Sequence, residues 1–313
     1  DKLSSLAESG NRYAMLASTA PLSPMRRFDD IIGGPAALPF YRRLQQLSKT
    51  SAGLQEIARE LDTLHAHIIA QPPTVLCAGL DQDGVILAGL LDLPAVDKAA
   101  AKEEVTEESA VNAPPVVPLP LANTALHATS QINHCFVSWT VPGVHSPDAS
   151  ALAVAAELMT NQVLHTALRE KGGAYGGSAS YAAGAGTFTL SSYRDPRLAG
   201  TYADFDVTLT QILDGDFSQE QVEEAIICVI KGLDKPHSPY AEALTAWNMQ
   251  QRGTTEAVRQ QFRTGVLTCT LEQIKGVTRT WLKDGQPSRA AFAGNTTQDL
   301  AGLEVVDLLA LAS

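Results

Sequence analysis

The chain has few positive charges and no long apolar run, and each shortage excludes a class of protein. Its 313 residues hold 23 Lys and Arg against 34 Asp and Glu, which gives a formal net charge of −11. A surface of that sign repels phosphate backbones, so nucleic acid is not an expected partner. The longest apolar runs, such as Val85 to Leu93, are broken by glycine and too short to span a bilayer, so no membrane partner is expected either.

Cysteine is also scarce, and its placement excludes a disulfide framework. The four cysteines lie far apart in apolar stretches and none forms a Cys-x-x-Cys pair: Cys77, Cys135, Cys228 and Cys269. A chain of this length can bury a core without disulfides, so buried thiols are predicted. This pattern favours a reducing compartment, the cytoplasm or an organelle matrix, without choosing between them.

The motifs of common hydrolases are missing as well. The seven histidines form neither His-Glu-x-x-His nor His-x-x-Glu-His, and His65 and His67 point different ways on a predicted helix. We therefore expect no metal site in this chain. Residues 176–180 superficially suggest a nucleophile elbow, but they lack Gly-x-Ser-x-Gly and follow a helix instead of preceding one. A serine hydrolase would rest on Ser178 alone.

The secondary structure that is present divides at a proline-rich stretch, residues 114–120. Before it, the patterning predicts a strand at 10–18, helices at 25–32, 38–47 and 54–69, and a strand at 74–79. The third helix carries an apolar face made of Leu54, Ile57, Leu61, Leu64 and Ile68. A faint similarity of Gly10–Tyr13 to Gly172–Tyr175 suggests a repeat whose first copy is incomplete, so that the chain would begin inside a domain.

After the proline-rich stretch the signals are clearer. Asp148 is placed to cap a long helix that stops at Gly172 and Gly173, and capping boxes begin at Ser218 and Thr270. The predicted strands are 123–130, 134–141, 175–182, 187–193 and a final one at 289–293. Further helices are predicted at 198–213, from 218, at 240–251, near 256–262 and from 270.

The stretch Leu164–Gly177 has two interpretations. It is typical of a helix end, because Arg169 and Lys171 suit the helix dipole and the glycines close the cap. Alternatively, Arg169 and Tyr175 flank one turn and point into the same cleft. A guanidinium and a phenol there could hold a peptide carbonyl as it gains negative charge. The residues by themselves leave both interpretations open.

Two blocks of sequence resemble a known family. Leu168–Tyr175, followed in order by Phe188–Pro196, is similar to the last domain of the presequence peptidases. These are members of the pitrilysin/insulinase family of zinc metallopeptidases. Weaker similarity extends from residues 10–14 to the closing helices.

The resemblance implies a half of a larger enzyme. Full-length relatives carry four homologous α+β domains in two halves that close around a peptide. The first half holds the zinc and the general base, and the second supplies an Arg and a Tyr, whose positions match Arg169 and Tyr175. This chain has no inverted zinc motif and about half of the third domain is missing. Zinc is therefore expected in the missing N-terminal half, and the isolated chain is expected to be inactive.

The resemblance predicts an α+β fold with a mostly antiparallel sheet and helices packed on one face, in one complete and one partial copy. Residues 1–110 would be the latter part of the third family domain, 111–121 a linker, and 122–313 a complete fourth domain. The predicted function is a share in zinc-dependent endopeptidase action on unfolded peptides, with the N-terminal zinc-binding half as partner. The alternative is a non-catalytic scaffold or inactive subunit of a split peptidase, which would not need both Arg169 and Tyr175.

Overall fold

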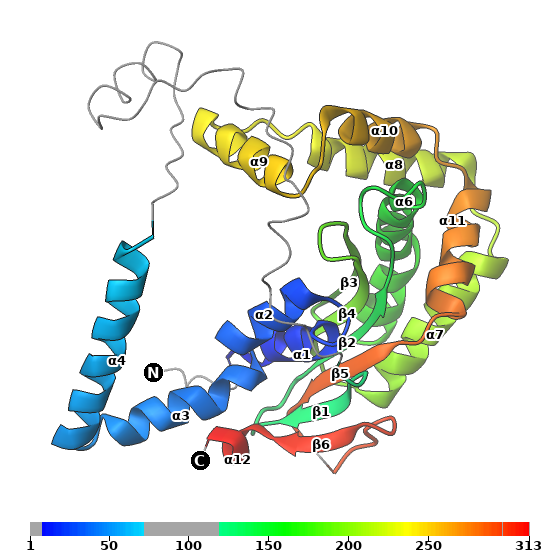
Figure 1. The fold of residues 1–313 in the computed structure, drawn as a ribbon. Helices are drawn as coiled ribbons and strands as arrows, with labels where there is room; N and C mark the ends of the chain where they lie inside the picture. The colour runs from blue at the N-terminus through cyan, green and yellow to red at the C-terminus, as the bar shows by residue number, and fades with distance from the viewer. Residues whose placement is uncertain (1–7, 72–118, 296, 313) are drawn as a thin grey trace, which may run out of the picture.

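The computed structural model describes residues 8–71, 119–295 and 297–312 (Figure 1). The first range is helical, and the helices predicted in it at 25–32, 38–47 and 54–69 are confirmed. The predicted strand at 74–79 and most of the predicted linker lie outside the described residues. The elements of this range are α1 (Gly10–Thr19), α2 (Pro24–Gly33), a 3-10 turn η1 (Pro35–Ala37), α3 (Leu38–Leu47) and α4 (Ser51–Ile69).

The rest of the described chain forms a sheet and its covering helices. The strands are β1 (Asn123–His127), β2 (Asn133–Thr140), β3 (Gly176–Ala182), β4 (Thr187–Asp195), β5 (Ser288–Ala293) and β6 (Glu304–Asp307). The helices are α6 (Ala149–Met159), its π-helical continuation η4 (Thr160–Lys171), α7 (Ala199–Asp214), α8 (Gln219–Leu233), α9 (Pro239–Gln251), α10 (Glu256–Leu267), α11 (Leu271–Val277), its π-helical continuation η5 (Thr278–Lys283) and α12 (Leu308–Ala312). Each strand and helix predicted here is present, but the strand at 289–293 is not the final one, because β6 and α12 follow it and were not predicted.

The helix starts show which capping signals were correct. Ser218 and Thr270 each form a complete capping box with the glutamine three residues on. Asp148 precedes α6, but its side chain makes no capping bond. Instead it accepts a hydrogen bond from Nε1 of Trp281 at 2.9 Å. The predicted cap at Asp148 is therefore wrong, because a distant indole N–H uses the carboxylate.

The sheet is mixed and has the strand order β3-β4-β2-β5-β1-β6. Pairs β3–β4, β4–β2 and β2–β5 are antiparallel, whereas β1 runs parallel to both β5 and β6. Three of the five strand pairs are thus antiparallel, as a mostly antiparallel sheet requires, but the two pairs of β1 are parallel and make the sheet mixed. Edge strand β3 is protected at its centre, where the Ala179 N–H donates to the Thr160 hydroxyl at 2.9 Å.

Helices cover both faces of the sheet, which corrects the prediction of one covered face. The main core lies between one face and α6, η4, α7, α8, α10 and α11. On the other face, Tyr13, Ala14 and Leu38 of the first segment pack against Phe136 and Phe292. Strand β2 is buried along seven consecutive residues, which is typical of a strand with both faces covered.

Helix α1 replaces the strand that we predicted at 10–18. Gly10, Tyr13 and Ala14 follow helical spacing and are all buried. Gly10 lies so close to the Phe292 ring that an added Cβ would be 2.6 Å from it, so a helix can approach the sheet only with glycine there. The proposed repeat also fails at this point, because Gly10 begins a helix whereas Gly172 follows the end of one.

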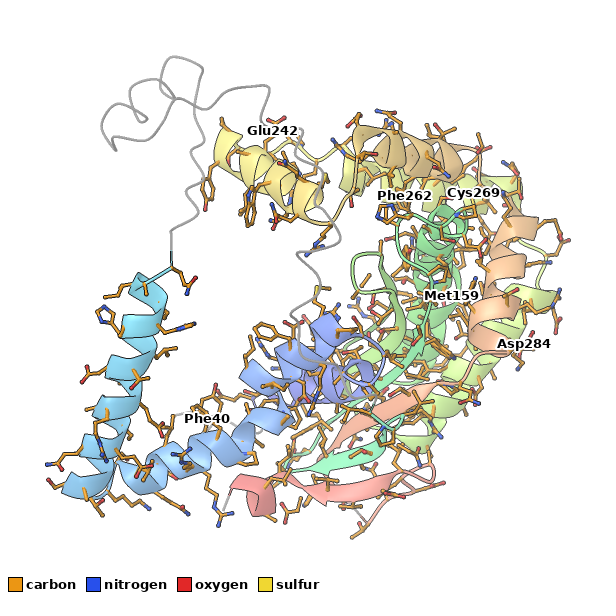
Figure 2. The ribbon with its side chains drawn as sticks, viewed as in Figure 1. Phe40, Met159, Glu242, Phe262, Cys269 and Asp284 are labelled. Carbon is orange, nitrogen blue, oxygen red and sulfur yellow. The ribbon has the colours of Figure 1, made fainter. Side chains whose placement is uncertain are left out.

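Helices α3 and α4 extend away from the sheet (Figures 1 and 2). The apolar face predicted on α4 exists, but the described residues leave it exposed. Leu54, Leu61, Leu64 and Ile68 each keep more than half of their surface accessible. None of the described helices has the length and apolar character needed to cross a membrane.

Candidate functional site

Arg169 and Tyr175 lie on either side of a tight turn between η4 and β3. The helix ends at Lys171, and Gly173 takes a left-handed conformation with φ of 78°. The Ala174 N–H donates to the Leu168 carbonyl at 2.9 Å, which closes the turn. The Tyr175 N–H then donates to the Tyr193 carbonyl at 3.1 Å, so the chain enters the sheet directly at this tyrosine.

Two glycines let the turn pack tightly. An added Cβ at Gly177 would overlap the Leu168 side chain, which is fully buried beneath β3. At Gly172 it would overlap the guanidinium of Arg197. The small residues of this stretch are therefore needed for the packing next to Arg169 and Tyr175.

A buried carboxylate anchors the loop behind the turn. Asp195 is fully buried and accepts hydrogen bonds from the Arg197 N–H at 2.9 Å and the Thr201 hydroxyl at 2.6 Å. Arg197 also pairs with Asp204 at 2.8 Å. Asn133 donates to the carbonyls of Asp195 and Arg197 at 3.2 Å each. This network holds the end of β4 against the turn, because the buried Asp195 carboxylate and the Asn133 amide both hydrogen-bond to this loop.

Both predicted site residues are exposed. Arg169 lies on the surface at the end of η4, and Tyr175 keeps 69% of its surface accessible although it sits beside a buried turn. Within the described ranges, no carboxylate lies within 4.0 Å of the Arg169 guanidinium. An exposed phenol and an unpaired guanidinium on one rigid turn are free to donate to a bound molecule. That they point into one cleft stays a prediction.

Tyr175 is the outer end of a row of four aromatic rings that crosses the sheet, here called the aromatic row. Its members are Phe292 on β5, His134 on β2, Tyr193 on β4 and Tyr175. Successive ring centroids are 5.9, 4.9 and 6.0 Å apart. The exposed fraction increases along the row: it is 0% for Phe292, 3% for His134, 38% for Tyr193 and 69% for Tyr175. The row thus connects an exposed phenol to the interior of the sheet by ring contacts.

His134 is neutral in this setting. Burial, together with the charge of Arg194, lowers its pKa to about 4. Its Nδ1 accepts a hydrogen bond from the Arg194 N–H at 3.2 Å, which requires a lone pair on that nitrogen. Arg194 has φ of 50°, a conformation that side chains other than glycine rarely adopt. The buried imidazole therefore supports the backbone next to Tyr193.

The sequence raised two other kinds of site, a metal site and a serine nucleophile, and the described residues form neither. The described part of the chain contains no group of three or more His, Cys, Asp or Glu side chains that could hold a metal ion, so the residues present do not fit a zinc site. The Ser178 hydroxyl lies 3.2 Å from the Ser191 hydroxyl, and no histidine contacts it. Cys135 and Cys269 are buried as predicted, whereas Cys228 is exposed and contradicts that prediction; Cys77 lies outside the described residues.

Parts of this chain, including the turn, are similar to known proteins. Residues 141–279 match the family model of the PreP C-terminal domain. The mitochondrial presequence protease of Yarrowia lipolytica is 29% identical over 305 residues, which cover 94% of this chain and 29% of that protein. The chain is a distant homologue of the presequence proteases. The homologous Xenopus laevis protein is 24% identical over 320 residues, covering 95% of this chain and 30% of that protein.

This presequence protease homologue thus spans about three tenths of the length of the curated relatives it matches. Among solved structures, the inactive domain of an M16 peptidase from Pseudomonas fluorescens has a TM-score of 0.47 and 15% identity. That alignment covers 57% of this chain and 45% of the other. The matched residues 141–279 include the turn, β3 and β4.

The sequence alone did not identify the residues that hold the site in place. Tyr193, Arg194 and Asp195 stand in the block that carried the family resemblance, yet no role was given to them. His134 showed no signal, because its partners come from β4 and β5. The run Tyr193–Arg197, which places aromatic, basic and acidic residues at the end of a strand, was the available clue.

Proposed function

We propose that this chain is the C-terminal, non-zinc-binding half of a zinc-dependent endopeptidase that degrades unfolded peptides in a closed chamber. A separate N-terminal half, on the same polypeptide or on another subunit, holds the zinc. The observation that supports this proposal is the tightly packed turn 172–174, beside which Arg169 and Tyr175 are exposed and have no side-chain hydrogen-bond partner among the described residues. Homology to presequence proteases over most of the chain supports it as well.

Each side chain has a distinct role in this proposal. When a peptide carbonyl is attacked, its oxygen gains negative charge, and donors already in position stabilise it without reorganising. The Tyr175 hydroxyl is such a donor, since its backbone is bonded to β4 and its ring contacts Tyr193. The Arg169 guanidinium binds the peptide through charge-assisted hydrogen bonds. This chain supplies these donors, and the zinc ligands come from the other half.

The alternative function is a scaffold that completes the chamber without touching the transition state. The packed glycines and the buried Asp195 network suit either function, because both need a stable domain. The two functions differ at the exposed ends of Arg169 and Tyr175. A scaffold gains nothing from leaving a guanidinium unpaired and a phenol 69% exposed at one turn.

Reconstitution tests the proposal. The chain is mixed with, or joined to, the zinc-binding half encoded with it, and turnover of an unfolded peptide is measured. We expect each half to be inactive and the combination to be active. Activity of the zinc-binding half that is unchanged when this chain is added would contradict the proposal.

A further inference from the structure

We propose that Arg194, held on the ring of Tyr193, binds a carboxylate of the peptide whose carbonyl is held at Tyr175. This inference rests on the proposed function and names a feature of its substrates. It concerns a residue in the second block of family resemblance to which the proposed function assigns no role.

Arg194 lies one ring away from the proposed reaction site. Its guanidinium carbon is 5.5 Å from the centroid of the Tyr193 ring, and that ring meets Tyr175 edge-on at 6.0 Å. Arg194 and both tyrosines are exposed. A peptide bound at Tyr175 therefore passes within reach of Arg194, since neighbouring residues of an extended chain are about 3.3 Å apart along it.

The charge of Arg194 has no partner within the described ranges, where no carboxylate oxygen lies within 4.0 Å of its guanidinium. Arg197, three residues along, shows the contrast: it pairs with Asp204 at 2.8 Å and lies 3.8 Å from Asp195. The loop thus has one arginine that holds the structure and one whose five N–H donors remain available.

The backbone fixes the direction of Arg194. A left-handed conformation is costly for a residue with a long side chain, so the surrounding contacts must maintain it. The bond from the Arg194 N–H to His134 does so on one side, and the buried Asp195 does so on the other. An arginine held at its backbone and supported by a ring loses less freedom when it binds a carboxylate than one on a mobile loop.

A carboxylate matches these donors best. The planar guanidinium forms two parallel hydrogen bonds with it, and peptides carry carboxylates on acidic side chains and at the C-terminus. The test therefore uses three fluorescent peptides of one unstructured sequence: one with a central Glu and an amidated end, one with Gln in place of Glu, and one with Gln and a free C-terminal carboxylate. Their affinities for the full chain are measured by anisotropy at low salt.

We expect the wild-type chain to bind one of the two carboxylate peptides about tenfold more tightly than the neutral one, as a charge-assisted bond gives. Whether the Glu peptide or the free-terminus peptide is preferred identifies the source of the carboxylate. Arg194→Asn should remove the preference, and asparagine tolerates the left-handed backbone. Arg194→Lys should keep part of it. Arg279→Gln, an equal loss of charge on η5 at the other face of the sheet, should keep all of it.

The outcomes separate this inference from the proposed function. Equal binding of all three peptides by the wild-type chain, or a preference that survives Arg194→Asn, would overturn the role of Arg194 and leave the proposed function standing. Binding of none of the peptides would contradict both. Circular dichroism of each variant shows whether a lost preference comes with lost structure.

Discussion

Adding one methyl group at Gly177 should destabilise the chain, whereas the same change at the neighbouring Gly176 should not. At Gly177 an added Cβ overlaps the side chain of Leu168 and lies 3.1 Å from the Ser191 carbonyl oxygen. Leu168 is fully buried and cannot swing into solvent. Overpacking of this kind costs about 1–3 kcal/mol. At Gly176 nothing lies within 4 Å of the added atom. Gly176→Ala should therefore be neutral within about 0.5 kcal/mol.

Urea unfolding followed by far-ultraviolet circular dichroism measures both variants. We expect a lower midpoint for Gly177→Ala at an unchanged slope, which marks a change in stability alone. The double variant Gly177→Ala with Leu168→Val makes room for the methyl group, so its loss should be smaller than the sum of the two single losses. Equal stability of Gly176→Ala and Gly177→Ala would refute the packing described for this turn.

Three further predictions concern the aromatic row, the exposed helix and the metal. The pKa of His134 is about 4 in the folded chain, whereas that of an unfolded histidine is about 6.5. As the pH falls from 7 to 5, the unfolded chain therefore binds a proton that the folded chain does not, and the free energy of unfolding should drop by about 2 kcal/mol. Asparagine cannot take up that proton, so in urea titrations at the two pH values His134→Asn should show a drop that is smaller by this amount. The same drop in the variant and the wild-type chain would contradict the account. The exposed leucines of α4 should cause self-association. In sedimentation, the double variant Leu61→Gln with Leu64→Gln should therefore be more monomeric than the wild-type chain. A wild-type chain that is monomeric at all concentrations would argue against this. The dialysed chain should carry no stoichiometric zinc in elemental analysis, and about one tightly held zinc per chain would refute this.

The sequence predicted local structure well where its signals were local. Capping boxes at Ser218 and Thr270, and the glycine stop after Lys171, depend on residues close together in the chain, and each stands where expected. The failures come from distant partners. The Asp148 carboxylate accepts a hydrogen bond from Trp281, and the segment at Gly10 is a helix that packs against the distant Phe292 ring.

The candidate site also has residues with local sequence signals and residues whose partners are distant in the chain. Arg169 and Tyr175 were found from one continuous block, and they do flank one turn. The aromatic row was not predictable, because its rings come from four strands or strand ends that are separated by up to about half of the sequence. The parallel pairing of β1 with β5 and β6 was missed for the same reason, since nothing near Asn123 indicates a partner at residue 289 or 304.

The central claim is that the Tyr175 hydroxyl stabilises the charge that develops on a peptide carbonyl. The most direct test is the turnover of an unfolded peptide by the chain combined with its zinc-binding half, for Tyr175→Phe and for the control Tyr240→Phe. Tyr240 on α9 is 63% exposed and also loses only a surface hydroxyl. We expect Tyr175→Phe to lower kcat by about 10²-fold or more, the usual effect of removing one oxyanion donor, and Tyr240→Phe to leave it unchanged. Wild-type turnover in Tyr175→Phe would contradict the claim and favour the scaffold.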